Sequence, residues 1–395
     1  MDTALHFSVL LAAVVCGWLL GRLSKKTVKA APRRESAHYY RGLAFLLSEQ
    51  PSAAVNTVIE ELPVDEETLP THLALANLMR SKGELESATR IHQNLLSRPT
   101  LAREKLHQVH LELAKDYISA GLLDRAERLL RDLADESASY RLEALERLQH
   151  IYQSEREWDR AVAVALQRLP RRGWLRKARS SNNNGEENIE RSLSHYYCEQ
   201  AEAAIAQAEF REARRILHKA RRHSSDNPRA ILLTAQLALT QGDPNYALRL
   251  LHELALEQGP YAAEILPLYR EAFAKVADRR AYINALQPIA EQSTSTALIL
   301  EVARALEEEK GRQAAADFLA RQCESRPTLG LLVGLTRYQP QGNPSVLANT
   351  IENIQRERPV YRCRHCGFSG RKLHWLCPSC EQWGTIAPIR GTLGD

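Results

Sequence analysis

The chain has 395 residues, with 53 Lys and Arg against 48 Asp and Glu and a formal net charge of +5. This length allows two or three domains and a sizeable core, and so small a charge does not by itself indicate nucleic-acid binding. Ala, Leu, Glu, Arg and Gln dominate the composition and favour helices. No long stretch alternates apolar and polar residues, so we expect an all-α protein without an extensive β-sheet.

The N-terminal segment predicts a membrane anchor, residues 1–23. Residues 4–23 are apolar apart from His6, Ser8 and Arg22, and about 20 such residues cross a bilayer as a helix. A signal peptide would place basic residues before the apolar run, but here they follow it, in the linker 24–36. The positive-inside rule therefore predicts a single-pass protein with its N-terminus outside the membrane and the rest in the cytoplasm.

One face of this anchor carries small residues. Ala13, Gly17 and Gly21 recur every four residues, a spacing that lets two membrane helices approach closely. Small residues are also common in membrane spans generally, so the pattern leaves open whether a specific partner helix binds there.

Residues 37–356 contain an internal repeat. Segments such as GELESA and GLLDRA end in an alanine that recurs at spacings of mostly 34 residues, a period typical of the tetratricopeptide repeat. Gly83, Gly121 and Gly242 fall at the expected turn between the two helices of a unit. The recurring alanines are Ala54, Ala88, Ala126, Ala161, Ala213, Ala247, Ala281 and Ala315. We therefore expect a solenoid of about eight to nine helical pairs, an architecture that usually holds another protein.

The largest spacing between successive alanines is 52 residues and indicates an insertion near 171–188. This segment is basic at first and then rich in Asn and Gly. We interpret it as a solvated loop; contact of its basic residues and Trp174 with anionic lipid or nucleic acid is the alternative. The sequence assigns no role to its Asn-rich part, residues 180–188.

The C-terminal segment, residues 357–395, predicts a metal-binding domain. Cys363 and Cys366 form one C-x-x-C pair, and Cys377 and Cys380 form a second after ten residues. Four thiolates at this spacing fit one metal ion in a tetrahedral site, either zinc or iron. Each pair is expected on a tight turn, with a short hairpin formed by the residues between the pairs. So small a segment depends on the metal for much of its folding energy.

Other readings of this segment are weaker. The remaining cysteines, Cys16, Cys198 and Cys323, are scattered and look like small apolar residues, so we expect a reducing compartment and no disulfide framework. His365 and His374 lie between the ligands, but with four thiols present we interpret both as surface groups or as groups that hydrogen-bond to the ligands. The aromatic residues are expected to pack the two turns and to dock the domain on the last helices of the array.

The order of these segments along the chain resembles that of a known family. The anchor is followed by YYRGLAFLLSEQPSAAV, RSKGELESATRIHQNLL and ISAGLLDRAERLL, and the chain closes with YRCRHCGFSGRKLHWLCPSCEQWGTIAPIRG. This order is similar to the LapB family, the lipopolysaccharide assembly protein B family of Gram-negative bacteria. The resemblance covers nearly the whole chain, except that the insertion at 180–188 and the segment GRKLHWL depart from it. It implies a rubredoxin-like zinc-ribbon domain with metal ligands at Cys363, Cys366, Cys377 and Cys380.

The resemblance also implies a function. Proteins of this family sit in the inner membrane and act as non-catalytic adaptors between the membrane protease FtsH and the deacetylase that commits material to lipid A. The anchor, through its Ala13, Gly17 and Gly21 face, is thought to contact a membrane-embedded regulator that senses lipopolysaccharide. A scaffold for lipopolysaccharide synthesis and export enzymes, without a role in proteolysis, fits the same features. The sequence leaves the oligomeric state open, including a homo-oligomer.

An enzyme is the remaining class. The chain contains no P-loop, G-x-S-x-G, H-E-x-x-H or G-x-G-x-x-G motif. His107 and His110 share one helix face with Glu104, a pattern more often found on a solvated surface than in a metal site. Of the enzymatic functions, we keep open only a redox function of an iron ion bound to the four thiols. Nucleic-acid binding through basic residues of the ribbon is not expected in a membrane-tethered protein.

Overall fold

The computed structural model describes Val15, Trp18, Asn353 and the ranges 64–98, 101–170, 184–257, 261–276, 279–292, 295–338 and 358–391. The predicted anchor and the first repeat, around Ala54, lie outside these residues apart from Val15 and Trp18. Within the described part of the chain, no helix combines the length and apolar character that a bilayer crossing requires.

The chain divides into two compact units, residues 1–151 and 152–395. Helices α4 to α7 pack most extensively against their neighbours in sequence, as in α4 with α5 and α6 with α7. These helices are α4 (Leu69–Ser81), α5 (Leu85–Leu96), α6 (Arg103–Ser119), α7 (Leu123–Glu136) and α8 (Arg141–Ser154), the last of which runs into the second unit.

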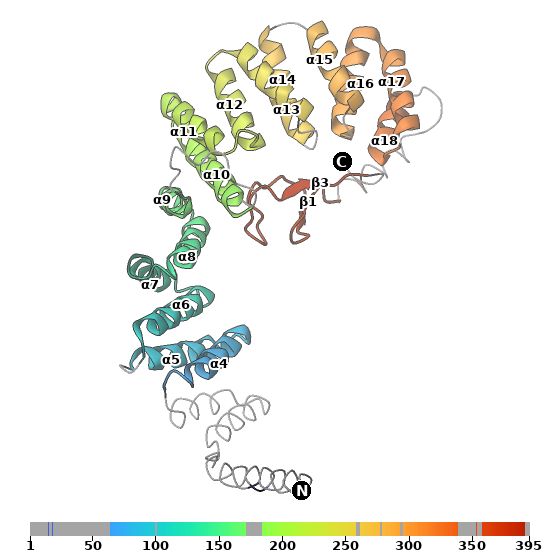
Figure 1. The fold of residues 1–395 in the computed structure, drawn as a ribbon. Coiled ribbons are helices and arrows are strands. Elements are labelled where there is room, and N and C mark those ends of the chain that lie inside the picture. The colour runs from blue at the N-terminus through green and yellow to red at the C-terminus, as the bar shows by residue number, and fades with distance from the viewer. Residues whose placement is uncertain are drawn as a thin grey trace, which may run out of the picture. The chain divides into compact units, whose positions relative to one another are not determined.

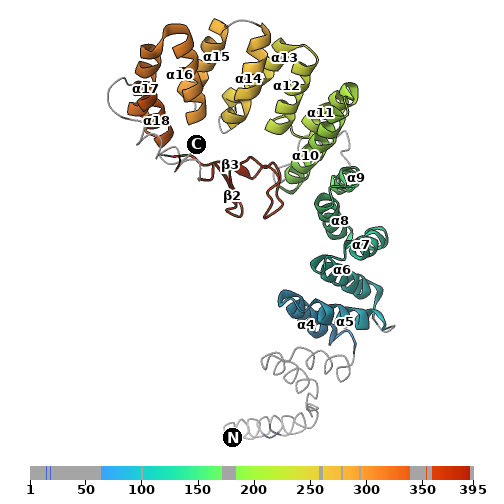
Figure 2. The same cartoon turned by 180° about the vertical axis from the view of Figure 1, so that it is seen from behind.

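The second unit continues the helical array and ends in a small sheet. Helices α10 to α18 follow one another along an arc, and the strands lie on its inner side (Figures 1 and 2). The helices are α9 (Trp158–Arg168), α10 (Asn184–Ala206), α11 (Phe210–His223), α12 (Pro228–Thr240), α13 (Pro244–Glu257), α14 (Ala262–Val276), α15 (Arg279–Gln292), α16 (Thr296–Lys310), α17 (Arg312–Ser325) and α18 (Leu329–Tyr338).

The recurring small residues explain why the helices pair closely. Most marker alanines among the described residues, such as Ala88 and Ala213, are completely buried, and so are small residues twelve positions earlier, such as Ala76 and Ala201. A methyl side chain at both positions allows the two backbones to approach, and the larger apolar residues around them fill the core. Ala281 is the exception and is only half-buried, in a unit whose repeat pattern is degenerate. The tetratricopeptide-like solenoid predicted from the 34-residue period is therefore confirmed.

The predicted insertion is shorter than 171–188 at its C-terminal end. Residues 184–188 form the first turns of α10 and not a loop. Glu186 and Glu187 suit this position because carboxylates are favourable near a helix N-terminus, and Glu187 pairs with Arg191 one turn later at 2.8 Å. Asn and Gly favour loops, so their presence led to the prediction of a loop where this helix begins. Residues 171–183, with Trp174, lie outside the described residues.

The C-terminal domain is a three-stranded antiparallel sheet in the order β2-β1-β3. Its strands are β1 (Tyr361–Cys363), β2 (Ser369–Gly370) and β3 (Ile386–Pro388). Tyr361 pairs with Gly370 on one side and with Pro388 on the other. The predicted hairpin between the two C-x-x-C pairs is wrong: β1 and β2 enclose the first pair, and an isolated bridge from Leu376 to Trp383 encloses the second. Each cysteine turn thus closes its own short hairpin.

Candidate metal centre and its docking surface

The first cysteine turn is built by hydrogen bonds to Cys363. The N–H groups of His365 and Cys366 lie 3.4 and 3.5 Å from Cys363 Sγ, and the Gly367 N–H donates to the Cys363 carbonyl at 3.1 Å. Gly367 has a φ of +81°, a conformation that glycine adopts without steric cost. Gly367, directly after the second cysteine, therefore closes this turn without strain.

The second turn repeats this arrangement with a different residue. The Glu381 N–H donates to the Cys377 carbonyl at 2.9 Å, and the Cys377 N–H donates to the Gln382 carbonyl at 3.1 Å. Glu381 occupies the place of Gly367 and also has a positive φ, +53°. The tight turn is kept here although its residue carries a Cβ.

The two turns bring all four predicted cysteines together. Their sulfur atoms lie within 4.8 Å of one another; Cys363 Sγ is 3.8 Å from Cys380 Sγ, and Cys366 Sγ is 3.6 Å from Cys377 Sγ. A tetrahedral site with metal–sulfur bonds of about 2.3 Å has sulfur atoms about 3.8 Å apart. Disulfide sulfurs lie only about 2.05 Å apart. The thiols therefore fit a single metal ion and are not arranged as disulfides.

The surroundings of the thiols lower the pKa of two of them, Cys363 and Cys366, and so favour loss of a proton there. Burial opposes ionisation of Cys363, but its contact with Thr385 and the two N–H groups of the turn lower the pKa of Cys363 to about 6. Burial raises the pKa of Cys380 to about 12, and the neighbouring thiols reinforce that shift. A metal ligand must be a thiolate, so the first turn favours the form of its two cysteines that binds an ion.

The histidines near the thiols take no part in the cluster. His365 and His374 are exposed, as predicted, and the sulfur cluster contains cysteines alone. Glu104, His107 and His110 form no metal-binding group, because the four thiols are the only such cluster among the described residues. His107 is instead nearly buried, with Nε2 3.8 Å from a Glu136 carboxylate oxygen.

The metal domain docks on the middle of the array and not on its last helices, which corrects the prediction. Trp383 is 6% exposed, and its ring stacks on His195 of α10 at a centroid distance of 4.8 Å. The rings of Tyr196 and Trp158 meet the same indole edge-on at 5.9 and 6.1 Å. Apolar aromatic burial of this kind contributes several kcal/mol.

Gln153 is the residue that the sequence analysis missed. Its Oε1 accepts hydrogen bonds from Trp383 Nε1 at 2.7 Å and from Tyr196 Oη at 3.0 Å. Its Nε2 donates to the Glu381 carbonyl at 2.9 Å. A glutamine near the end of α8 carries no sequence signal for this role, because Trp383 and Glu381 lie more than two hundred positions away.

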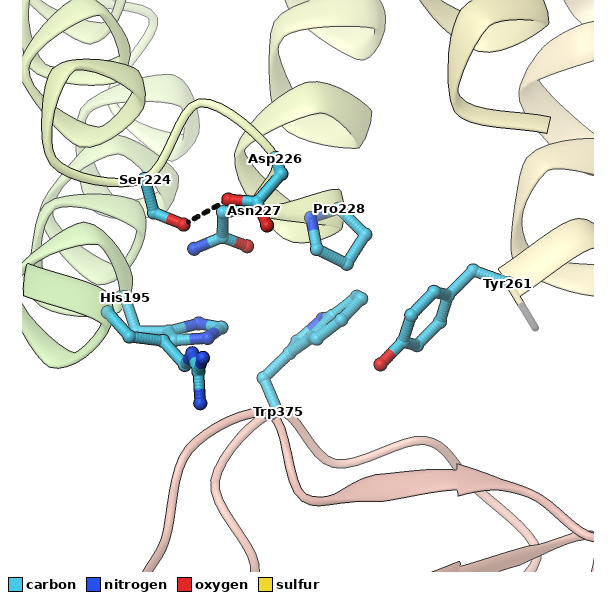
Figure 3. Close-up of a pocket in the computed structure, with 9 residues that line it drawn as sticks. His195, Ser224, Asp226, Asn227, Pro228, Tyr261 and Trp375 are labelled. Atoms are coloured by element: carbon cyan, nitrogen blue, oxygen red, sulfur yellow. Dashed lines mark hydrogen bonds between the residues drawn. The ribbon is translucent and has the colours of Figure 1, made fainter. Parts of the chain in front are cut away.

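A small cavity lies beside this contact (Figure 3). Its volume is about 200 Å³, and Trp375 stands in it between His195 and Tyr261. The Tyr261 ring is 5.5 Å from Trp375, and Asp226 accepts a hydrogen bond from Ser224 at 2.7 Å. Farther along, the Tyr361 hydroxyl donates to Glu264 of α14. The domain therefore contacts α8, α9, α10, α12 and α14.

His195 is buried at this seam as a neutral group. Desolvation lowers its pKa to about 3, and the nearby Arg229 and Arg191 reinforce the shift. Its Nδ1 has no hydrogen-bond partner among the described residues. Arg229 is itself buried but is paired with Glu199 at 2.8 Å and Glu202 at 3.0 Å. The docking surface therefore holds the charged guanidinium of Arg229, which has acidic partners, but keeps the imidazole of His195 neutral.

The fold and the thiol cluster define a class: a tetratricopeptide-like repeat protein that carries a rubredoxin-like metal-binding domain. A family profile described as a rubredoxin metal binding domain matches residues 361–388. Among solved structures, a tetratricopeptide repeat protein from Parabacteroides merdae matches with a TM-score of 0.34 and 14% identity, over 69% of this chain and 99% of that one.

Curated relatives define the particular family. Lipopolysaccharide assembly protein B of Escherichia coli K12 is 31% identical over 99% of both chains. The protein of the same name from Haemophilus influenzae is 33% identical over 98% of both chains. The chain therefore belongs to the lipopolysaccharide assembly protein B family, which confirms the resemblance that the repeats and the cysteine turns indicated.

Proposed function

We propose that this chain is a non-catalytic, membrane-tethered adaptor that regulates lipopolysaccharide biosynthesis. The observation that carries the proposal is the similarity over nearly the full length, including the metal domain, to proteins named lipopolysaccharide assembly protein B. A role in lipopolysaccharide assembly follows most directly from that similarity. The finer proposal is that the chain promotes FtsH-dependent proteolysis of the lipid A committed-step deacetylase.

The architecture supports an adaptor. A solenoid offers a long surface on which a partner chain binds, and four thiolates around one ion leave no open position for a substrate. Cys363, Cys366, Cys377 and Cys380 would hold zinc or iron, and the ion would cross-link the two turns that present Trp375 and Trp383 to the helices. Metal binding and docking are then one folding event.

The tether completes the proposal. Residues 1–23 would anchor the chain in the bacterial inner membrane with its N-terminus in the periplasm, and residues 24–36 would link the anchor to the cytoplasmic array 37–356 and the metal domain 357–395. Confinement at the membrane raises the effective concentration of the deacetylase at the protease. The Ala13, Gly17 and Gly21 face would contact a membrane-embedded regulator that senses lipopolysaccharide.

The half-life of the deacetylase in cells depleted of this protein tests the proposal. A half-life prolonged by severalfold, restored by the intact gene, is the expected result. An unchanged half-life would reject the proteolytic role. It would favour the second candidate, a scaffold for lipopolysaccharide synthesis and export enzymes, which the same repeat surface supports.

A further inference from the structure

A cleft of about 540 Å³ lies between three consecutive helices of the second unit, away from the metal domain. From α11 it is lined by Arg214, His218 and Arg221, which are spaced to share one helix face. Arg249, on the first turns of α13, contributes a third guanidinium. The cleft therefore gathers three permanent positive charges in one concavity.

These three arginines lack acidic partners. Arg214 donates to the neutral side-chain oxygen of Gln241, Arg249 lies over the Tyr246 ring at 5.5 Å, and Arg221 Nε is buried without a hydrogen-bond partner. None of the three forms an ion pair with a carboxylate of the described residues. The carboxylate that does line the cleft, Asp243, accepts the Tyr246 N–H at 3.0 Å at the start of α13.

Neighbouring arginines show the ordinary arrangement. Arg215, next in sequence to Arg214, pairs with Glu212 of its own helix at 2.6 Å. Arg229, at the start of α12, is paired with two glutamates. Unpaired guanidinium groups cost free energy when they are brought close together, because like charges repel. Three unpaired arginines around one cleft indicate a site that an external anion completes.

The floor of the cleft is apolar. Leu217, Leu237 and Ala238 are nearly completely buried beneath it, and the Tyr246 ring forms part of its wall. The volume falls within the range of sites for small organic ligands, about 300–1,000 Å³. The site therefore suits a molecule with a compact anionic group and a less polar remainder.

We propose that this cleft binds a ligand that carries a phosphate or diphosphate ester. A guanidinium fork matches phosphate oxygens with two parallel hydrogen bonds, and one phosphate monoester carries about 1.5–2 negative charges at pH 7. A single such group neutralises most of the charge of the cleft, whereas an acidic peptide would have to bring several carboxylates into the same small volume. The site does not depend on the adaptor role.

The test measures inorganic pyrophosphate binding by calorimetry, with the full chain in phosphatidylcholine nanodiscs. The cleft variant combines Arg214→Gln with Arg221→Gln. The control combines Arg211→Gln with Arg222→Gln, which removes the same charge from exposed positions on the same helix. We expect at least about a tenfold loss of affinity in the cleft variant and less than about a threefold loss in the control. Unchanged thermal unfolding of both variants verifies that they fold.

Nanodiscs that contain phosphatidic acid separate two sources of the phosphate. If they compete with pyrophosphate, the ligand is a phospholipid headgroup; if the pyrophosphate affinity is unchanged, the ligand is a soluble phosphate compound. Both results keep the site. Equal losses in the two double variants, tighter binding of a hexaglutamate peptide than of pyrophosphate, or the absence of saturable pyrophosphate binding would overturn the proposal.

Discussion

In five of the described repeats, the turn between the two helices contains a residue in the left-handed conformation. Gly83, Gly121 and Gly242 occupy it with φ between +72° and +85°, but Arg156 and Ala208 adopt φ of +60° and +59° at the same place in other units. A residue with a Cβ loses about 1–2 kcal/mol in this conformation. The repeat geometry thus persists where its preferred residue is missing, at a local cost.

Ala208→Gly should therefore stabilise the protein. Removing the Cβ relieves the strain, and because glycine also gains entropy in the unfolded chain, the net gain is about 0.5–1 kcal/mol in the free energy of unfolding. Chemical denaturation followed by circular dichroism measures it. The matched control, Ala203→Gly on the exposed face of α10, should destabilise by about 1 kcal/mol. Destabilisation by both substitutions would contradict the argument.

His195 links stability to pH. Its pKa is about 3 in the folded protein because burial disfavours the imidazolium, whereas an exposed histidine has a pKa of about 6.5. Between these values the unfolded chain binds one more proton, so stability should fall by about 1.4 kcal/mol for each pH unit below about 6.5. In His195→Phe, which keeps the ring stack on Trp383, this contribution to the pH dependence should vanish. Identical pH profiles of the two proteins would reject this assignment.

At the scale of elements, the Gln153 amide makes two of the hydrogen bonds that join the metal domain to the array. Gln153 satisfies the buried Trp383 indole and a backbone carbonyl of the second cysteine turn. Gln153→Ala should leave these groups without partners and weaken docking by about 2–4 kcal/mol. Hydrogen exchange in residues 361–388 measures the effect. Gln236→Ala, on the exposed face of α12, should leave this exchange unchanged, and equal protection in both variants would contradict the role of Gln153.

The two cysteine turns depend on the same ion. Replacing Cys363 and Cys366 with serine removes half of the thiolates, so we expect loss of the bound metal. We also expect the fluorescence of Trp375 and Trp383 to change, because both side chains would leave their contacts with the helices. The helical array has its own core around Leu251 and Tyr269 and should keep its circular dichroism signal. Metal analysis by mass spectrometry checks the first result. A variant that retains one equivalent of metal would show that the cysteines are not the ligands.

For the whole molecule, tethering is the central prediction. If the chain is the adaptor proposed above, removing residues 1–23 should leave a folded protein that does not shorten the half-life of the deacetylase, because free diffusion lowers the local concentration of substrate at the protease. The measurement uses native expression, since overproduction would mask the loss. Fusing an unrelated membrane anchor to the truncated chain should restore degradation if tethering alone matters. Normal degradation by the untethered chain would refute the tethering argument.

The sequence by itself determined the repeat and the metal turns, because both depend on local spacing. A 34-residue period fixes which alanines meet inside a helical pair, and two C-x-x-C pairs each fold on their own turn with Gly367 or its counterpart. Composition also indicated the helical class correctly. The prediction was wrong at Asn184 to Asn188, where local signals conflict. Asn and Gly favour a loop there, whereas Glu186 and Glu187 favour the start of a helix.

Tertiary structure alone decided where the metal domain binds and what completes the binding surface. Trp383 and Gln153 are distant in sequence, and nothing in their neighbourhoods identifies them as partners. The cleft of Arg214, Arg221 and Arg249 has the same origin: each arginine looks like an ordinary surface residue on its helix, and only the packing of α11, α12 and α13 places the three around one concavity. Long-range contacts form where shapes and charges match, and a single sequence does not record that match.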